Sequence, residues 1–173
     1  SIADFLSGEK KLEDVVVSLG HGIDLVPGGS GIQKLVNLND LERRNLLDQV
    51  GQIPECYDYM LIDTAPGIGE NVLYLNSAAT ESNIIITPDP SSLTDAYALI
   101  KVLHQTYRSA KFKIICNMVK DESEALFLYK RLSDVASRFL HVSLDYVGHI
   151  PSDANLRNAT KTQHLVLNSH PNS

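Results

Sequence analysis

Apolar and polar positions follow two different patterns along the chain. Short continuous apolar runs are separated by longer stretches in which apolar residues recur every three or four positions. The first pattern is typical of strands buried on both faces of a sheet, and the second is typical of helices with one buried face. The runs that predict strands are 22–27, 59–62, 83–87, 112–116 and 144–150.

The longer stretches predict helices at 1–6, 39–50, 70–80, 92–103, 121–139 and 154–160, and residues 11–17 fit either a short helix or the approach to a strand. Strands that alternate with helices build parallel βαβ units. We therefore predict an α/β fold, a doubly wound sheet of about five parallel strands with right-handed crossovers. No linker or repeat divides the chain, so we expect a single domain over residues 1–173.

Polar residues mark the starts of several helices. Asn39 precedes one helix, Ser91 or Ser92 is the expected cap of another, and Asp121 or Ser123 that of a third. In the third helix, the apolar face is predicted to consist of Leu126, Tyr129, Leu132, Val135, Ala136 and Phe139.

The run 59–62 ends abruptly in Asp63, and small, turn-forming residues follow as far as Gly69. Open α/β sheets bind ligands beyond the carboxyl ends of their strands. If the ligand is a nucleoside triphosphate, Asp63 is placed to hold the water shell of Mg²⁺, and the turn after it could move with the state of the phosphate. The alternative is a plain strand-to-turn junction, which is common in α/β proteins.

The carboxyl ends of parallel strands lie at one edge of a sheet, so the polar residues that follow the strands are expected to gather there. The residues in question are Asp63, Thr64, Thr87, Asn117, Pro151 and Asp153. By contrast, the glycine-rich stretch 28–31 lacks the Lys-Ser/Thr pair of a phosphate-binding loop, because Ile32 and Gln33 follow it. A tight turn is the preferred interpretation there.

Composition narrows the function classes. At 43% hydrophobic and 21% charged residues, the 173-residue chain is close to the globular average. A net charge of −6 disfavours binding to nucleic acid through overall electrostatic attraction. Two cysteines and six histidines show no metal-ligand spacing, and reduced thiols fit a cytoplasmic protein. We expect Arg43 and Arg44 to lie on a solvated helix face, and Asp95 either caps a helix or lies at an interface.

Segments 26–32, 57–68 and 87–101, in this order, resemble the MinD/ParA family of ATPases, and within it the regulators of flagellar number. Segments 116–119 and 150–153, with Arg157, fit the same pattern. The likeness covers essentially the whole chain, and 87–101 is its most specific part. The resemblance implies Mg²⁺-ATP binding, a face-to-face homodimer in the ATP state and slow ATP hydrolysis.

The resemblance also implies roles for individual residues. Asp63 would be the catalytic and Mg²⁺-binding carboxylate, and Thr64 and Gly67 would belong to the loop that senses the γ-phosphate. Asn117 would contact adenine through its amide. The positions implied near the base, the nucleotide or the dimer face are Pro88, Asp95, Pro151 and Asp153, with Arg157 as a further candidate contact.

The sequence departs from the family pattern at its start, because the K-G-G-x-G-K-[ST] loop is not in it. It reads as if it began roughly sixty to seventy residues late, on the usual size of two βα units. We therefore expect this chain alone to bind ATP weakly or not at all and to be inactive as an ATPase. Exposed sheet edges would favour association. The amphipathic membrane-targeting helix of the family is not visible either.

Three readings of function stay open. The first is the core of an ATPase switch that sets flagellar number or placement, with flagellar regulatory or assembly proteins as partners and peripheral contact with the inner face of the membrane. The second is a non-catalytic fragment or degenerate paralogue that acts as a protein-interaction module. The third is a ParA-type partitioning ATPase, which the acidic balance and the absence of a basic cluster disfavour.

Overall fold

The computed structural model describes residues 4–5, 7–20, 22–28, 39–51 and 57–171. The chain divides into two compact units. The first consists of Ser1–Ala65 with Gly69–Leu75, and the second of Pro66–Ile68 with Asn76–Ser173. The boundary runs through helix α4 (Glu70–Ala78). A single domain over residues 1–173 stays a prediction.

The first unit contains a short 3₁₀ helix, η1 (Glu13–Val15), strands β1 (Val17–Gly20) and β2 (Ile23–Leu25), and helix α3 (Asp40–Val50). The two strands pair antiparallel, so the strand predicted at 22–27 forms, but in a hairpin rather than in the parallel sheet. The side chains buried together in this unit are Phe5, Leu12, Val15 and Leu46. Helix α3 thus packs on residues from the start of the chain.

Helix α3 begins as the sequence predicts. The Asn39 side-chain oxygen accepts a hydrogen bond from the Glu42 N–H (3.0 Å), and the Glu42 carboxylate accepts one from the Asn39 N–H (3.0 Å). This reciprocal pair is a capping box, which satisfies two backbone donors that the helix leaves unpaired.

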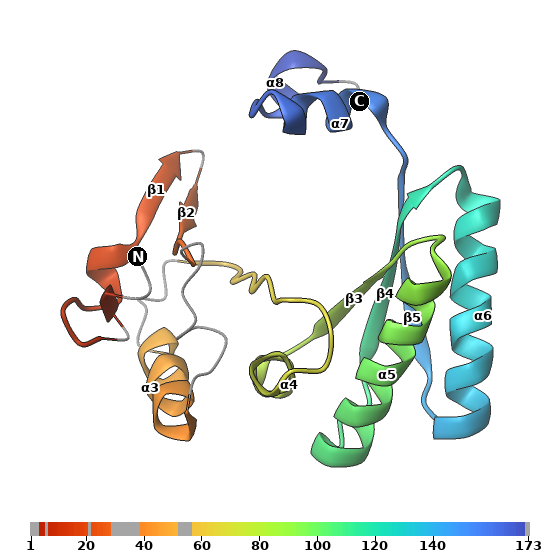
Figure 1. The fold of residues 1–173 in the computed structure, drawn as a ribbon, viewed down its shortest axis with the longest axis horizontal. Coiled ribbons are helices and arrows are strands. Elements are labelled where there is room, and N and C mark those ends of the chain that lie inside the picture. Colours follow the sequence, from red (N-terminus) through yellow and green to blue (C-terminus); the bar gives the residue numbers. More distant parts are fainter. Residues whose placement is uncertain (1–3, 6, 21, 29–38, 52–56, 172–173) are drawn as a thin grey trace. The chain divides into compact units, whose positions relative to one another are not determined.

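The second unit is built on a parallel sheet in the order β3-β4-β5, with β3 at Ser82–Ile86, β4 at Phe112–Val119 and β5 at Leu144–Pro151. Helices α5 (Pro90–Tyr107) and α6 (Glu122–Leu140) pack against each other and against the strands (Figure 1). The predicted α/β class is therefore confirmed. The described residues give three parallel strands in place of the five expected.

One face of this sheet is buried and the other is open. Ile86, Phe112 and Ile114 are fully buried, together with Ile100 and Leu103 of α5. The alternate positions of the strands point the other way and stay accessible, with Ile85 57% and Val147 54% exposed. The prediction that the apolar runs are buried on both faces is therefore wrong for the described structure, and the period of two along β3 and β4 is that of a half-buried sheet.

The strand predicted at 59–62 does not form. Residues 57–69 contain neither strand nor helix, and Tyr59 and Leu61 are 88% and 92% exposed. A strand is stable only when its N–H and C=O groups pair with a neighbour. This segment has no ladder partner among the residues that the structure describes, and apolar character alone does not supply one.

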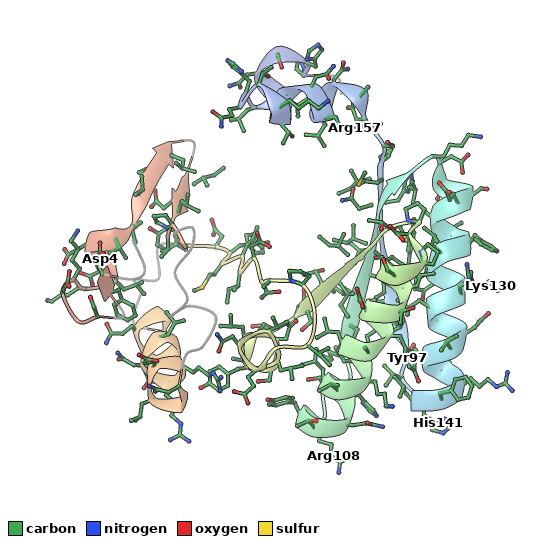
Figure 2. The ribbon with its side chains drawn as sticks, in the orientation of Figure 1. Asp4, Tyr97, Arg108, Lys130, His141 and Arg157 are labelled. Carbon is green, nitrogen blue, oxygen red and sulfur yellow. The ribbon has the colours of Figure 1, made fainter. Side chains whose placement is uncertain are left out.

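The ends of α5 and α6 differ partly from prediction. Asp89, not Ser91 or Ser92, caps α5, with Pro90 at the first helical position. Asp121 caps α6 as one of the two predicted candidates, and its carboxylate accepts from the Glu124 N–H at 3.0 Å. Both helices end in a left-handed residue, Arg108 and His141 (Figure 2).

The buried face of α6 is shifted from the predicted one. The buried residues are Ala125, Leu128, Leu132, Ala136 and Leu140, so the exposed Leu126, Val135 and Phe139 lie outside the core. Apolar residues occupy two neighbouring faces of α6, and the face that carries two alanines allows the closest approach to the sheet.

Two short helices follow β5, namely α7 (Ala154–Lys161) and α8 (Val166–Ser169). Helix α7 agrees with the predicted 154–160. None of the helices in the described ranges combines the length and apolar character that a bilayer crossing requires.

Candidate functional site

The carboxyl ends of β3, β4 and β5 meet at one edge of the sheet. Ile86, the last residue of β3, pairs with Cys116, so Thr87 leaves the sheet next to Asn117, which itself still pairs with Ile150 of β5. Beyond them, Val119 pairs with Pro151, and its carbonyl accepts a hydrogen bond from the Ser152 N–H at 2.8 Å. The structure thus brings Thr87, Asn117 and Pro151 to a common edge, as the sequence predicts for parallel strands.

Asn117 lies at a local irregularity of β4. The pairing register shifts between Asn117 and Val119, and Met118 has a φ of 58°, which is unusual for a residue other than glycine. The half-buried Asn117 side chain braces this bulge, because its oxygen accepts from the Met118 N–H at 2.9 Å. Its amide nitrogen donates no hydrogen bond within the described parts of the chain. An amide with a donor to spare can make a two-point contact with the edge of adenine.

The loop after β5 is shaped by Asp153. Its carboxylate accepts from the N–H groups of Asn155 (2.6 Å) and Leu156 (3.4 Å) and so caps α7. Arg157, on α7 (Figure 2), donates to the Ser152 hydroxyl at 3.3 Å. Asp153 therefore fixes the loop through the helix, and the exposed Pro151 and Ser152 are the part of the loop that faces outward.

The loop after β3 is held in a similar way. The Thr87 N–H donates to the Ser92 hydroxyl at 3.0 Å, and the Asp89 carboxylate accepts from the Ser91 N–H at 3.4 Å. Pro88 is exposed between them. Asp95 is exposed on α5 and does not cap it, which leaves its interface role as a prediction.

The predicted switch residues lie in the irregular segment 63–69. Asp63 is exposed, Thr64 is half-buried, and both belong to the first compact unit. Gly67 has a φ of 96°, a conformation that favours glycine and supports a turn at this point. The metal role of Asp63 stays a prediction.

The donor set around Asp63 limits what metal chemistry is reasonable. Among the described residues, no group of three or more His, Cys, Asp or Glu side chains lies close enough to hold a metal ion. Mg²⁺ in nucleotide sites is commonly held by one or two carboxylates together with substrate phosphates and water. A single exposed carboxylate fits an ion that arrives with the nucleotide rather than a permanent metal site.

The groups beneath the edge are structural. Burial raises the pKa of the Cys116 thiol, which donates to the Ala125 carbonyl at 3.3 Å and stays protonated. Burial also raises the pKa of Tyr146, whose ring packs on Tyr129 with centroids 5.3 Å apart. Neither group has the exposure or activation of a nucleophile. Of the glycine-rich stretch 28–31, Gly28 is exposed, and residues 29–31 lie outside the described residues.

Arg43 is the residue that sequence reasoning misses. Its side chain is only 11% exposed, and it donates to Asn71 (2.8 Å) and Glu70 (2.7 Å) at the start of α4. The predicted solvated face holds for its exposed neighbour Arg44 but is wrong for Arg43. Its partners lie more than 25 residues away in sequence, so no local pattern indicates the contact.

The chain is similar to curated proteins along its whole length. It is 36% identical over 173 residues to the antiactivator FleN of Pseudomonas aeruginosa and 31% identical over 174 residues to the flagellum site-determining protein YlxH of Helicobacter pylori. It is 22% identical over 173 residues to an uncharacterized ATP-binding protein of Methanocaldococcus jannaschii. These matches cover 99–100% of this chain but 62%, 58% and 61% of the relatives, so the chain spans about 60% of their length. No family model matches the chain.

With a shorter match to a septum site-determining MinD protein, these similarities define the class. The chain belongs to the MinD/ParA family. Within that family it is close to the branch that holds FleN and YlxH. The resemblance that segments 57–68 and 87–101 indicate is thus confirmed.

Proposed function

We propose that this chain is the core of a nucleotide-dependent switch that regulates the number or placement of flagella. The observation that carries the proposal is the 36% identity to FleN across the whole chain. The flagellar role named for YlxH supports it independently. Because the chain spans about 60% of these relatives, the activity is proposed for the full-length protein.

The sheet edge supplies the base-binding part of this proposal. Asn117 would hold adenine through its amide, and the exposed Pro151 and Ser152 would flank the ring. Asp153 keeps that loop in place through its cap of α7. Pro88 would border the nucleotide from the loop after β3. The description of one relative as ATP-binding supports adenine as the base.

The segment 63–69 supplies the switch. Asp63 would be the carboxylate that binds Mg²⁺ through its water shell, and Thr64 and Gly67 would let the loop respond to the γ-phosphate. Bound Mg²⁺-ATP supplies a divalent charge and a phosphate that distinguishes two states of the loop. The exposed position of Asp63 and the left-handed φ of Gly67 are compatible with both roles.

The readout of the switch would be association. The family resemblance implies a homodimer in the ATP state, and we extend this to the present chain. Flagellar regulatory or assembly proteins would be the partners, in the cytoplasm and at the inner face of the membrane. The family resemblance supports these assignments.

Two experiments on the full-length protein test the proposal. Calorimetric titration should give micromolar ATP binding that requires Mg²⁺, and deletion of the gene should change the number or position of flagella. Failure to bind nucleotide would reject the switch, whereas a flagellar phenotype without binding would favour a non-catalytic interaction module.

A further inference from the structure

Arg43 joins helix α3 to the first two turns of α4. Its Nε donates to the Asn71 side chain at 2.8 Å, and its Nη2 donates to the Glu70 carboxylate at 2.7 Å. The guanidinium also lies over the Tyr74 ring, 6.0 Å from the centroid. All four residues belong to the first compact unit. A planar group with three contacts at one helix end fixes the orientation of that end more firmly than a single point charge would.

This placement carries an electrostatic cost that the Glu70 carboxylate offsets. The N-terminus of a helix carries partial positive charge, so a cation there opposes the helix dipole. The Arg43 side chain is also largely withdrawn from water, at 11% exposure, while its partner Glu70 is 83% exposed. An exposed lysine would link the two helices with less desolvation. The partly buried guanidinium and its carboxylate partner thus tie α3 to the start of α4.

The role is not direct ligand binding. The cavity lined by Arg43, Leu46, Asn71, Tyr74 and Leu75 has a volume of about 10 Å³. That is room for about one water molecule. The guanidinium therefore acts on the helix itself.

Helix α4 begins at Glu70, directly after the segment 63–69 that carries Asp63 and the left-handed Gly67. We propose that Arg43 is a positioning residue that holds the first turn of α4 on α3 and so fixes the downstream end of this loop. The inference rests on the proposed function, because it assigns the loop a nucleotide-dependent rearrangement. With its end fixed, the loop presents Asp63 in a reproducible position, and Arg43 itself touches neither nucleotide nor metal.

The test uses the full-length protein with the variants Arg43→Ala, Arg43→Lys and Glu70→Gln, and the exposed neighbour Arg44→Ala as the matched control. Steady-state ATP hydrolysis separates kcat from KM, and amide exchange of the ligand-free protein follows the first turn of α4. We expect Arg43→Ala to lower kcat about ten- to hundredfold, the scale of a misplaced catalytic group. KM should stay within about threefold, since base contacts are intact.

The other variants separate positioning from folding. Arg43→Lys keeps the charge but loses the planar guanidinium that contacts Asn71 and Glu70 at once, so its kcat should lie between those of Arg43→Ala and the wild type. Glu70→Gln should lower kcat less than Arg43→Ala does. Exchange in the first turn of α4 should rise in the order of the kcat losses, and Arg44→Ala should match the wild type. If Arg43→Ala fails to fold, Arg43→Lys and Glu70→Gln carry the test.

Normal kcat in both Arg43→Lys and Glu70→Gln would overturn the inference. So would losses that follow only the fraction of folded protein. If the wild type itself neither binds nor hydrolyses ATP, the proposed function fails and this inference falls with it. If the wild type hydrolyses ATP and the Arg43 and Glu70 variants have the same kcat, only the inference about Arg43 is rejected and the proposed function stands.

Discussion

Replacing Asn117 with alanine removes one hydrogen bond that the structure shows and one base contact that we propose. The visible bond joins the Asn117 side-chain oxygen to the Met118 N–H at 2.9 Å. A bond of this kind contributes about 1 kcal/mol net to the free energy of unfolding. It also braces Met118, whose left-handed backbone costs about 1 kcal/mol in any variant.

The expected loss of stability is therefore about 1 kcal/mol, or a decrease in Tm of about 2–4 °C for a chain of this size. Loss of a two-point amide contact with adenine should weaken Mg²⁺-ATP binding about tenfold, which corresponds to about 1.4 kcal/mol. Differential scanning calorimetry measures the first effect, and isothermal titration of the full-length protein measures the second.

Asn83→Ala is the matched control, because Asn83 is an exposed asparagine on β3 of the same sheet. It should leave ATP affinity unchanged. An Asn117→Ala protein that folds and binds Mg²⁺-ATP with wild-type affinity would refute the assignment of Asn117 to the base.

Three further predictions concern the scaffold. Phe112→Ala should lower the free energy of unfolding by about 3–5 kcal/mol, because Phe112 is fully buried; a loss below 1 kcal/mol by urea denaturation would contradict the core. The Glu124 N–H lowers the pKa of Asp121 below its ordinary 3.8. The difference in Tm between the wild type and Asp121→Ala should therefore be largest above pH 4 and should shrink as the pH falls through the lowered pKa. A difference in Tm that persists in strong acid would contradict this. In a Cys56→Ala background, a thiol reagent should react with the buried Cys116 only after unfolding, and rapid reaction in the native protein would be the contrary result.

The sequence predicts most of the second unit correctly. The runs at 83–87, 112–116 and 144–150 become β3, β4 and β5 within a few residues, since each is short, apolar and bounded by turn residues. The edge that gathers Thr87, Asn117 and Pro151 follows from parallel pairing alone. These features need only local pattern and general topology.

Other features depend on contacts that a local pattern does not contain. The run 59–62 is as apolar as β3, yet it remains irregular and has no pairing partner among the described residues. The buried face of α6 combines Ala125 and Ala136 with three leucines, whereas Leu126, Val135 and Phe139 lie outside the core. The cap at Asp89 could have been predicted from the sequence, because Asp followed by Pro is a typical helix start.

The central proposal is that the Asn117 amide, at the edge of the sheet β3-β4-β5, holds the base of a bound Mg²⁺-nucleotide. A crystal structure of the full-length protein with Mg²⁺ and a non-hydrolysable ATP analogue measures this most directly. The account predicts the Asn117 amide within hydrogen-bonding distance of adenine and the Asp63 carboxylate at the water shell of the metal. A base bound away from β4, or an Asp63 carboxylate remote from Mg²⁺, would contradict it.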